Sequence, residues 1–186
     1  MRDQSDATTQ KCALLDAARD NAGKHYDDLF RTFIALDTKA QNTATIAGVQ
    51  LGAILAFFHK GALEVLVALY GATVLAVAVF IPLLLLLVVG ACVWAMKVAD
   101  APEPFDARNE IVALRSLVAL PDSEFTPLTR LNHLSEHLEF WRNCVDEMTG
   151  VTSRKAESVQ ACQYVMLLGL HGTISLFILF ILGLPR

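Results

Sequence analysis

Two long stretches of this 186-residue chain carry almost no charge. Within Ala40–Met96 the only formally charged residues are Lys60 and Glu64, and Gln160–Pro185 contains none. Hydrophobic residues make up 54% of the sequence and charged residues only 18%, whereas about a quarter of the residues of an ordinary soluble domain are charged. We therefore expect an all-α membrane protein.

Three segments are candidates for membrane spans, because a helix needs about 20 apolar residues to cross a hydrocarbon core of roughly 30 Å. The first is Thr43–Phe58 and the last is Ala161–Leu184. The apolar run between them is too long for one perpendicular span at about 1.5 Å per residue. We divide it into an interfacial piece, Ala62–Tyr70, and a second span, Gly71–Met96. Two spans within residues 62–96 are the alternative.

Basic residues near the span ends predict the orientation of the chain. If the N-terminus is cytoplasmic, thirteen of the fifteen Lys and Arg residues lie inside, and only Lys60 and Arg186 lie outside. A multi-pass protein with a cytoplasmic N-terminus and an external C-terminus is therefore expected. Its parts are a cytoplasmic helix (1–42), two spans (43–98), a cytoplasmic helical region (99–158) and a last span (159–186).

Mainly apolar residues at alternating steps of three and four form a helical seam in the N-terminal segment. No Gly or Pro occurs between Lys24 and Gly48, so one helix is expected to run from the cytoplasm through the first span. The seam consists of Cys12, Leu15, Arg19, Ala22, Tyr26, Leu29, Phe33, Leu36 and Ala40.

Two more cytoplasmic helices are expected before the last span. A short seam occupies Asp106–Leu120. Thr126 followed by Pro127 is a helix start signal, an N-cap residue and a proline at the first helical position. The sequence thus predicts a small helical bundle that is continuous with the first and last spans. The seam of its last helix consists of Leu131, Leu134, Leu138, Trp141, Val145 and Met148.

Small residues recur at every fourth position from just before the first span to near its end. Such a ladder allows two helix backbones to approach closely in lipid. It has two interpretations: packing against another span of the same chain, or association between subunits. The second predicts a homo-oligomer and makes Gln50 an interhelical hydrogen-bond donor. The ladder consists of Ala40, Ala44, Gly48, Gly52 and Ala56.

Polar side chains within the spans tend to face protein or a water-filled path. The candidates are Gln50, Gln163 and His171. The alternatives are that the glutamines extend to the interface and that the histidine caps a neighbouring carbonyl group.

Two charges, Asp37 and Lys39, precede the first span. Residues two positions apart do not face each other on a helix. We expect Lys39 to reach the lipid phosphates, and Asp37 to pair with a base at the foot of the last span, Arg154 or Lys155.

The stretch ALDTKAQNTATIAGVQLGAIL resembles the transmembrane effectors of Pycsar, a bacterial antiphage system. The element Asp37-x-Lys39-Ala40 runs directly into the first span, and the last span is entered through a helix with a lysine near its base, TSRKAESVQACQYVMLLGL. The resemblance implies a protein of the bacterial inner membrane that responds to cyclic CMP or cyclic UMP. Such effectors damage the membrane, so the infected cell stops growing or dies before the phage matures.

A cyclic nucleotide carries one negative charge, so the resemblance also implies a site with at least one base. Arg19 is the first candidate because it lies within the apolar seam, and an ion pair with an acid of a neighbouring helix is its alternative role. In the functional interpretation, the ligand disturbs the ion pair that Asp37 forms with Arg154 or Lys155. Lys39 lies close to this pair in the sequence. Two other functions stay open: a constitutive anchor or scaffold with a partner-binding bundle, and a small channel.

The remaining motifs argue against an enzyme, and no cofactor or metal is expected. His133 and His137 are four residues apart, but Leu134 occupies the position at which a zinc protease has its glutamate. There is no glycine-rich phosphate loop and no nucleophile elbow. An excess of 19 acidic over 15 basic residues disfavours nucleic acid as a partner. Membrane lipids, the nucleotide and a second subunit are the expected partners.

Overall fold

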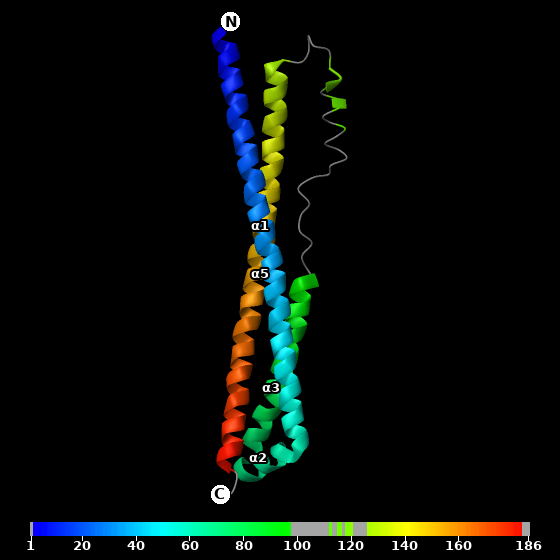
Figure 1. Ribbon diagram of the computed structural model, residues 1–186, viewed down its shortest axis with the longest axis vertical. Helices are drawn as coiled ribbons and strands as arrows, with labels where there is room; N and C mark the ends of the chain where they lie inside the picture. Colours follow the sequence, from blue (N-terminus) through cyan, green and yellow to red (C-terminus); the bar gives the residue numbers. More distant parts are fainter. Residues whose placement is uncertain (1, 98–111, 113–114, 117, 121–125, 184–186) are drawn as a thin grey trace. The chain divides into compact units, whose positions relative to one another are not determined.

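The computed structural model describes residues 2–97, 112, 115–116, 118–120 and 126–183 (Figure 1). This part of the chain is helical apart from short connections and contains no strand, which confirms the prediction of an all-α fold. The helix expected at Asp106–Leu120 falls mainly outside the described residues. The elements are α1 (Arg2–Phe57), a π-helical turn (Phe58–Ala62), α2 (Leu63–Tyr70), α3 (Ala72–Lys97) and α5 (Pro127–Gly183).

The chain folds as two compact units. The first unit comprises Met1–Phe33 and Ala101–Thr152, and the second comprises Ile34–Asp100 and Ser153–Arg186. Each of the helices α1 and α5 is divided between the two units, with one segment in the first unit and one in the second. The N-terminal helix predicted to continue into the first apolar segment is therefore present as α1.

Helix α5 begins at the position that the sequence predicts. The Thr126 hydroxyl accepts a hydrogen bond from the Thr129 N–H at 3.3 Å, and the Thr129 hydroxyl accepts one from the Thr126 N–H at 3.4 Å. Such reciprocal bonds satisfy backbone donors that have no partner within the first turn of a helix.

The first unit is held together by the two seams. Cys12 and Tyr26 of α1 are buried, as are Leu134 and Met148 of α5. Phe33 is buried as well, and the remaining seam positions of this unit are half-buried, which is what a stripe at alternating three- and four-residue spacing provides. Each large apolar side chain buried in this way stabilises the fold by about 1.5–3 kcal/mol.

Helices α1 and α5 run parallel in the first unit. The Arg130 guanidinium lies 2.8 Å from the Asp16 carboxylate, close to the start of α5. Further along both helices the rings of Tyr26 and Trp141 meet edge to face, with 5.9 Å between their centroids. Both contacts therefore advance along the two helices in the same direction.

Two glycines shape the connection between α1 and α3. Gly61 has a φ of 77° and Gly71 a φ of 74°, in the left-handed region that favours glycine. Gly61 lies in the turn that ends α1, and Gly71 separates α2 from α3. The break at Gly71 agrees with the interpretation of Ala62–Tyr70 as a separate piece ahead of the second span.

Within the second unit α3 runs antiparallel to α5, and the two helices approach closely at glycines of α5. A Cβ atom at Gly169 would lie 2.9 Å from Leu85 Cδ2, and one at Gly172 would lie 2.7 Å from Ile81 Cδ1. Contacts at these distances are closer than real Cβ atoms make, so a side chain at either position would require the end of the Leu85 or Ile81 side chain to move.

Helix α1 is parallel to α5 in the second unit as well. Asp37 of α1 contacts Lys155 of α5, and towards the end of both helices Phe57 stacks on Phe177 with 4.5 Å between ring centroids. The second unit therefore contains two parallel helices and one helix, α3, that runs in the opposite direction to α5.

Two described helices are long and apolar enough to cross a membrane. They are Ala72–Lys97, which is α3, and Leu128–Gly183, which contains the apolar end of α5. Large apolar side chains on these helices, such as Leu87 and Trp94 of α3 and Leu168 of α5, are exposed. This indicates a membrane protein, because lipid would cover such side chains. The apolar end of α1 is diluted by Asn, Gln and Thr residues and does not meet the same criterion, so three spans stay a prediction.

Candidate functional site

An ion pair joins α1 to α5 within the second unit. The Lys155 ammonium group lies 2.6 Å from the Asp37 carboxylate. Only 2% of the Lys155 side chain is exposed, against 36% for Asp37. A charge so deeply buried requires a partner, because moving an isolated ion out of water is very unfavourable. The predicted pairing of Asp37 with a base at the foot of the last span is thus confirmed, with Lys155 as a base.

The other bases of this region are exposed. Lys39 and Arg154 each lie next to the ion pair in sequence but on the outer face of their helix. Lys97, at the end of α3, is exposed too. Since α3 is antiparallel to α5, these bases lie at one end of the second unit, where lysine and arginine side chains would reach lipid phosphates.

The ladder of small residues lies partly on an open face of α1. Ala40 is fully buried and Ala44 packs against the core of the second unit, whereas Gly48, Gly52 and Ala56 are exposed. A Cβ atom at either glycine would meet no described atom within 4 Å. Within the described residues the start of the ladder therefore packs inside the chain, and the two glycines do not. Association between subunits stays a prediction.

The three polar residues of the apolar segments have different surroundings. The Gln50 carbonyl oxygen is buried and has no hydrogen-bond partner among the described residues. Gln163 is half-buried. The Nδ1 atom of His171 lies 2.8 Å from the Leu167 carbonyl oxygen, which can only accept, so Nδ1 carries the proton. His171 is exposed, and it contacts a carbonyl group of its own helix. The alternative expected for it was the capping of a neighbouring carbonyl group.

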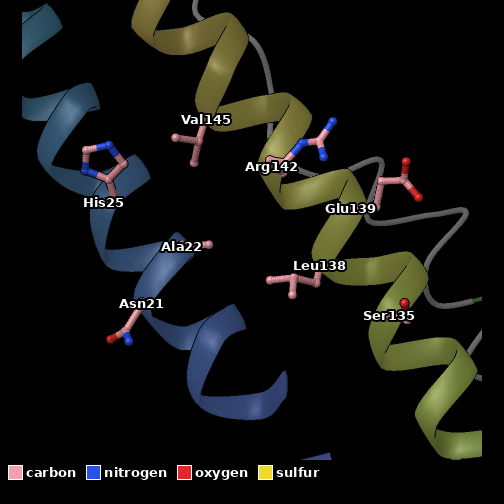
Figure 2. Close-up of a pocket in the computed structure, with 8 residues that line it drawn as sticks. All are labelled: Asn21, Ala22, His25, Ser135, Leu138, Glu139, Arg142 and Val145. Carbon is pink, nitrogen blue, oxygen red and sulfur yellow. The ribbon is translucent and has the colours of Figure 1, made fainter. Parts of the chain in front are cut away.

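A cavity of about 750 Å³ lies between α1 and α5 within the first unit. Figure 2 shows Ala22, Leu138 and Val145 directed into the space between the two helices. The cavity is therefore apolar at its centre. Polar side chains from both helices complete the lining: Asn21, His25, Ser135, Glu139 and Arg142.

Two of the lining residues can carry a positive charge. His25 comes from α1 and Arg142 from α5. The Arg142 side chain is 73% exposed, and its Nε atom lies 4.0 Å from Asp146, a distance at which an exposed ion pair is weak. The guanidinium group is thus largely exposed to solvent. Glu139 is the opposing charge and would disfavour a ligand with several negative charges.

Arg19 is not among the residues that line this cavity. Its guanidinium lies 3.1 Å from Asp20 and 3.6 Å from Asp16, and Asp16 also contacts Arg130 of α5. An ion pair was the alternative role for Arg19, but both acids belong to its own helix and only Asp16 extends the network to α5. A role of Arg19 in ligand binding stays a prediction.

Sequence reasoning did not identify His25 and Arg142 as cavity residues. Arg142 lies four residues after Leu138 and three before Val145, so its position next to the α5 seam could be deduced. The cavity itself could not be deduced, because it depends on which side chains of two helices face one another.

The two histidines of the α5 motif lie side by side. His133 and His137 stack with 6.0 Å between ring centroids. No group of three or more potential ligands occurs among the described residues.

Fold and site thus define an all-α chain with two helices that can span a membrane and a cavity in a separate helical unit. No protein-family model, no curated protein and no solved structure matches this chain.

Proposed function

We propose that the protein is a membrane effector whose first unit binds cyclic CMP or cyclic UMP and whose second unit then impairs the bacterial inner membrane in antiphage defence. One observation carries this proposal. Helices α1 and α5 line the cavity of the first unit, and the same two helices continue without interruption into the second unit. A ligand that contacts both helices therefore acts on elements of the apolar unit.

The cavity has the chemistry that a cyclic pyrimidine nucleotide requires. Its volume of about 750 Å³ falls in the range of 300–1,000 Å³ typical of small-molecule sites. The apolar centre suits the flat pyrimidine ring, and the Arg142 guanidinium suits the single negative charge of a cyclic phosphate. Asn21 and Ser135 supply groups that can hydrogen-bond to the base or ribose.

The ion pair between Asp37 and Lys155 is the proposed point of response. A ligand shifts a conformational equilibrium only through a difference in its affinity for the two states. The pair lies on the two helices that line the cavity, further along both of them. A change in how α1 and α5 pack would move the buried ammonium group of Lys155 into new surroundings. The free energy of the ion pair would then differ between the two arrangements of the helices.

Membrane damage would follow from a change in the second unit. The exposed glycines of α1, Gly48 and Gly52, offer a face on which a second subunit can approach closely. A homo-oligomer in the lipid is therefore part of the proposal. The resemblance of the Asp37-x-Lys39-Ala40 element to the Pycsar effectors supports the choice of ligand and of membrane.

Dye release from liposomes tests this function. The purified protein in vesicles of bacterial lipid should release a trapped dye when cyclic CMP or cyclic UMP is added, and not when the linear 5′-monophosphate is added. Arg142→Ala should raise the nucleotide concentration required by at least tenfold, because it removes a charged hydrogen-bond donor. Arg31→Ala, at an exposed position of α1 outside the cavity lining, is the matched control, and Arg19→Ala tests the base suggested by the sequence.

Leakage that is the same with and without every cyclic nucleotide would contradict the proposal. In that case a constitutive anchor or scaffold becomes the better interpretation if no leakage occurs, and a small channel if leakage is constant.

A further inference from the structure

Two cysteines of the second unit face each other across the interface of α3 and α5. Leu85 lies opposite Gly169 in this antiparallel pair. Cys92 follows Leu85 by about two helical turns, and Cys162 precedes Gly169 by about two turns, so both return to the same face of their helix at the same level. The helical register therefore places the two thiols together.

The packing of this unit agrees with the register. Cys92 is 0% and Cys162 is 7% exposed, and both belong to one hydrophobic cluster. Their side chains are close enough to share a hydrogen bond. The cysteines are nevertheless free thiols, so the contact exists in the reduced form.

An apolar cavity leads to this pair. It has a volume of about 630 Å³ and lies between α3 and α5, within the second unit. Cys162 lines it together with small residues, among them Gly90, Ala91 and Ala161. A small uncharged or apolar molecule can therefore approach Cys162, while Cys92 is not part of the lining and has no exposed surface.

We propose that Cys92 and Cys162 form an oxidation site for hydroperoxides, in which a reversible disulfide joins α3 to α5. The Cys162 sulfur attacks the terminal oxygen of the hydroperoxide, the O–O bond breaks, and the thiol proton passes to the leaving oxygen, so that an alcohol or water departs and Cys162 becomes a sulfenic acid. The Cys92 sulfur then attacks the Cys162 sulfur, an S–S bond forms, and the sulfenic oxygen takes the Cys92 thiol proton and leaves as water. Two thiols have lost two electrons and the peroxide oxygen has gained them.

The disulfide would fix the two helices that can span the membrane. Helices α3 and α5 already approach closely at Gly169 and Gly172, and a covalent bond about two turns away prevents them from separating. Oxidised protein would then resist any rearrangement that moves α3 against α5. This effect does not depend on which ligand the first unit binds.

The other two cysteines provide an internal comparison. Cys12 and Cys144 are also buried, but they belong to the first unit and lie at different levels of the parallel helices α1 and α5. They have the same thiol chemistry without an opposite cysteine at their level.

Thiol counting and peptide mapping test the proposal on the full chain in detergent. The protein is treated with hydrogen peroxide or with cumene hydroperoxide, an apolar probe, and the remaining thiols are then labelled with polyethylene glycol maleimide under denaturing conditions. The expected result is the loss of two of the four labels, their recovery with dithiothreitol, and a peptide that joins Cys92 to Cys162. A faster reaction with cumene hydroperoxide would show that access is through the apolar cavity.

Two variants separate the roles of the thiols. In Cys92→Ser the sulfenic acid on Cys162 should persist and be trapped by dimedone, and no disulfide should form. In Cys162→Ser, Cys92 should stay unlabelled by dimedone at the same peroxide dose. The proposal is wrong if Cys12 or Cys144 is oxidised first, if the disulfide joins two chains, or if both probes leave all four thiols intact after hours at millimolar concentration.

Discussion

Replacing Asp37 with Asn removes the carboxylate that lies 2.6 Å from the ammonium group of Lys155. The side chain of Lys155 is only 2% exposed, so water cannot take the place of the lost carboxylate unless the helices separate locally. Breaking a fully buried ion pair from one side typically costs about 3–5 kcal/mol. Because 36% of the Asp37 side chain is exposed, its pairing is weakened by water, and we expect Asp37→Asn to lower the free energy of unfolding by about 2–3 kcal/mol.

The opposite substitution should have a smaller effect. Lys155→Met fills the same buried space with an apolar side chain and leaves Asp37, which is partly hydrated. The expected loss is about 1 kcal/mol, and the double variant should lie close to Lys155→Met alone because the buried charge is then gone. The order of the two single variants therefore follows from the difference in exposure between the partners.

Unfolding in detergent micelles, followed by circular dichroism against a denaturant, measures these differences. Lys39→Met, an exposed lysine two residues from Asp37, serves as the control and should change stability by less than about 0.5 kcal/mol. The reasoning is refuted if Asp37→Asn is no more destabilising than Lys155→Met, or if both behave like the control. In the liposome assay Asp37→Asn should leak without nucleotide if the pair is the point of response.

Three further predictions test the topology, the helix packing and the thiol environment. A reporter fused after Arg186 should be external and one inserted at Pro121 cytoplasmic, and the reverse pattern would remove the argument for a cytoplasmic ligand. Gly172→Ala should destabilise the chain by about 1–3 kcal/mol through overpacking against α3, whereas Gly48→Leu should leave monomer stability unchanged and reduce crosslinking between subunits. Burial raises the pKa of the Cys144 thiol, with the Glu147 carboxylate adding to it, so the thiolate forms only at higher pH. Its alkylation in the folded protein should be slower at pH 8 than that of an exposed cysteine. The rate should continue to rise at pH values above the pKa of a free thiol. Equal rates for the two cysteines would contradict the assignment.

Much of the helical structure follows from local patterns in the sequence. The seams at three- and four-residue spacing predict which faces of α1 and α5 are buried, because this spacing returns to the same side of a helix. Thr126 and Pro127 predict the start of α5, and Gly71 lies at the break between α2 and α3. Each of these features depends on a few neighbouring residues, which makes it accessible to reasoning from sequence.

The contacts between helices are less accessible. Gly48 and Gly52 on α1 and the pair Gly169 and Gly172 on α5 both place glycines at helical spacing, yet among the described residues only the second pair closely contacts another helix. Spacing shows that a close approach is permitted, and it does not show which helix makes it. The partner of Asp37 was predictable because the apolar segments must begin at a common level. The cavity beside Arg142 depends on the relative rotation of two helices, which no local pattern determines.

The parallel direction of α1 and α5 has a consequence for the synthesis of the protein. Parallel neighbours cannot be joined by a short hairpin, and here the chain must first pass through α2, α3 and the segment that follows before α5 is made. Asp37 leaves the ribosome long before Lys155, so the nascent chain carries an acid at the edge of its first apolar segment while that partner is still missing. A truncated chain that lacks α5 would retain this acid and the uncovered side chains of α3. Such a chain would expose a surface that α5 covers in the complete protein, and quality-control proteases of the cell could recognise it.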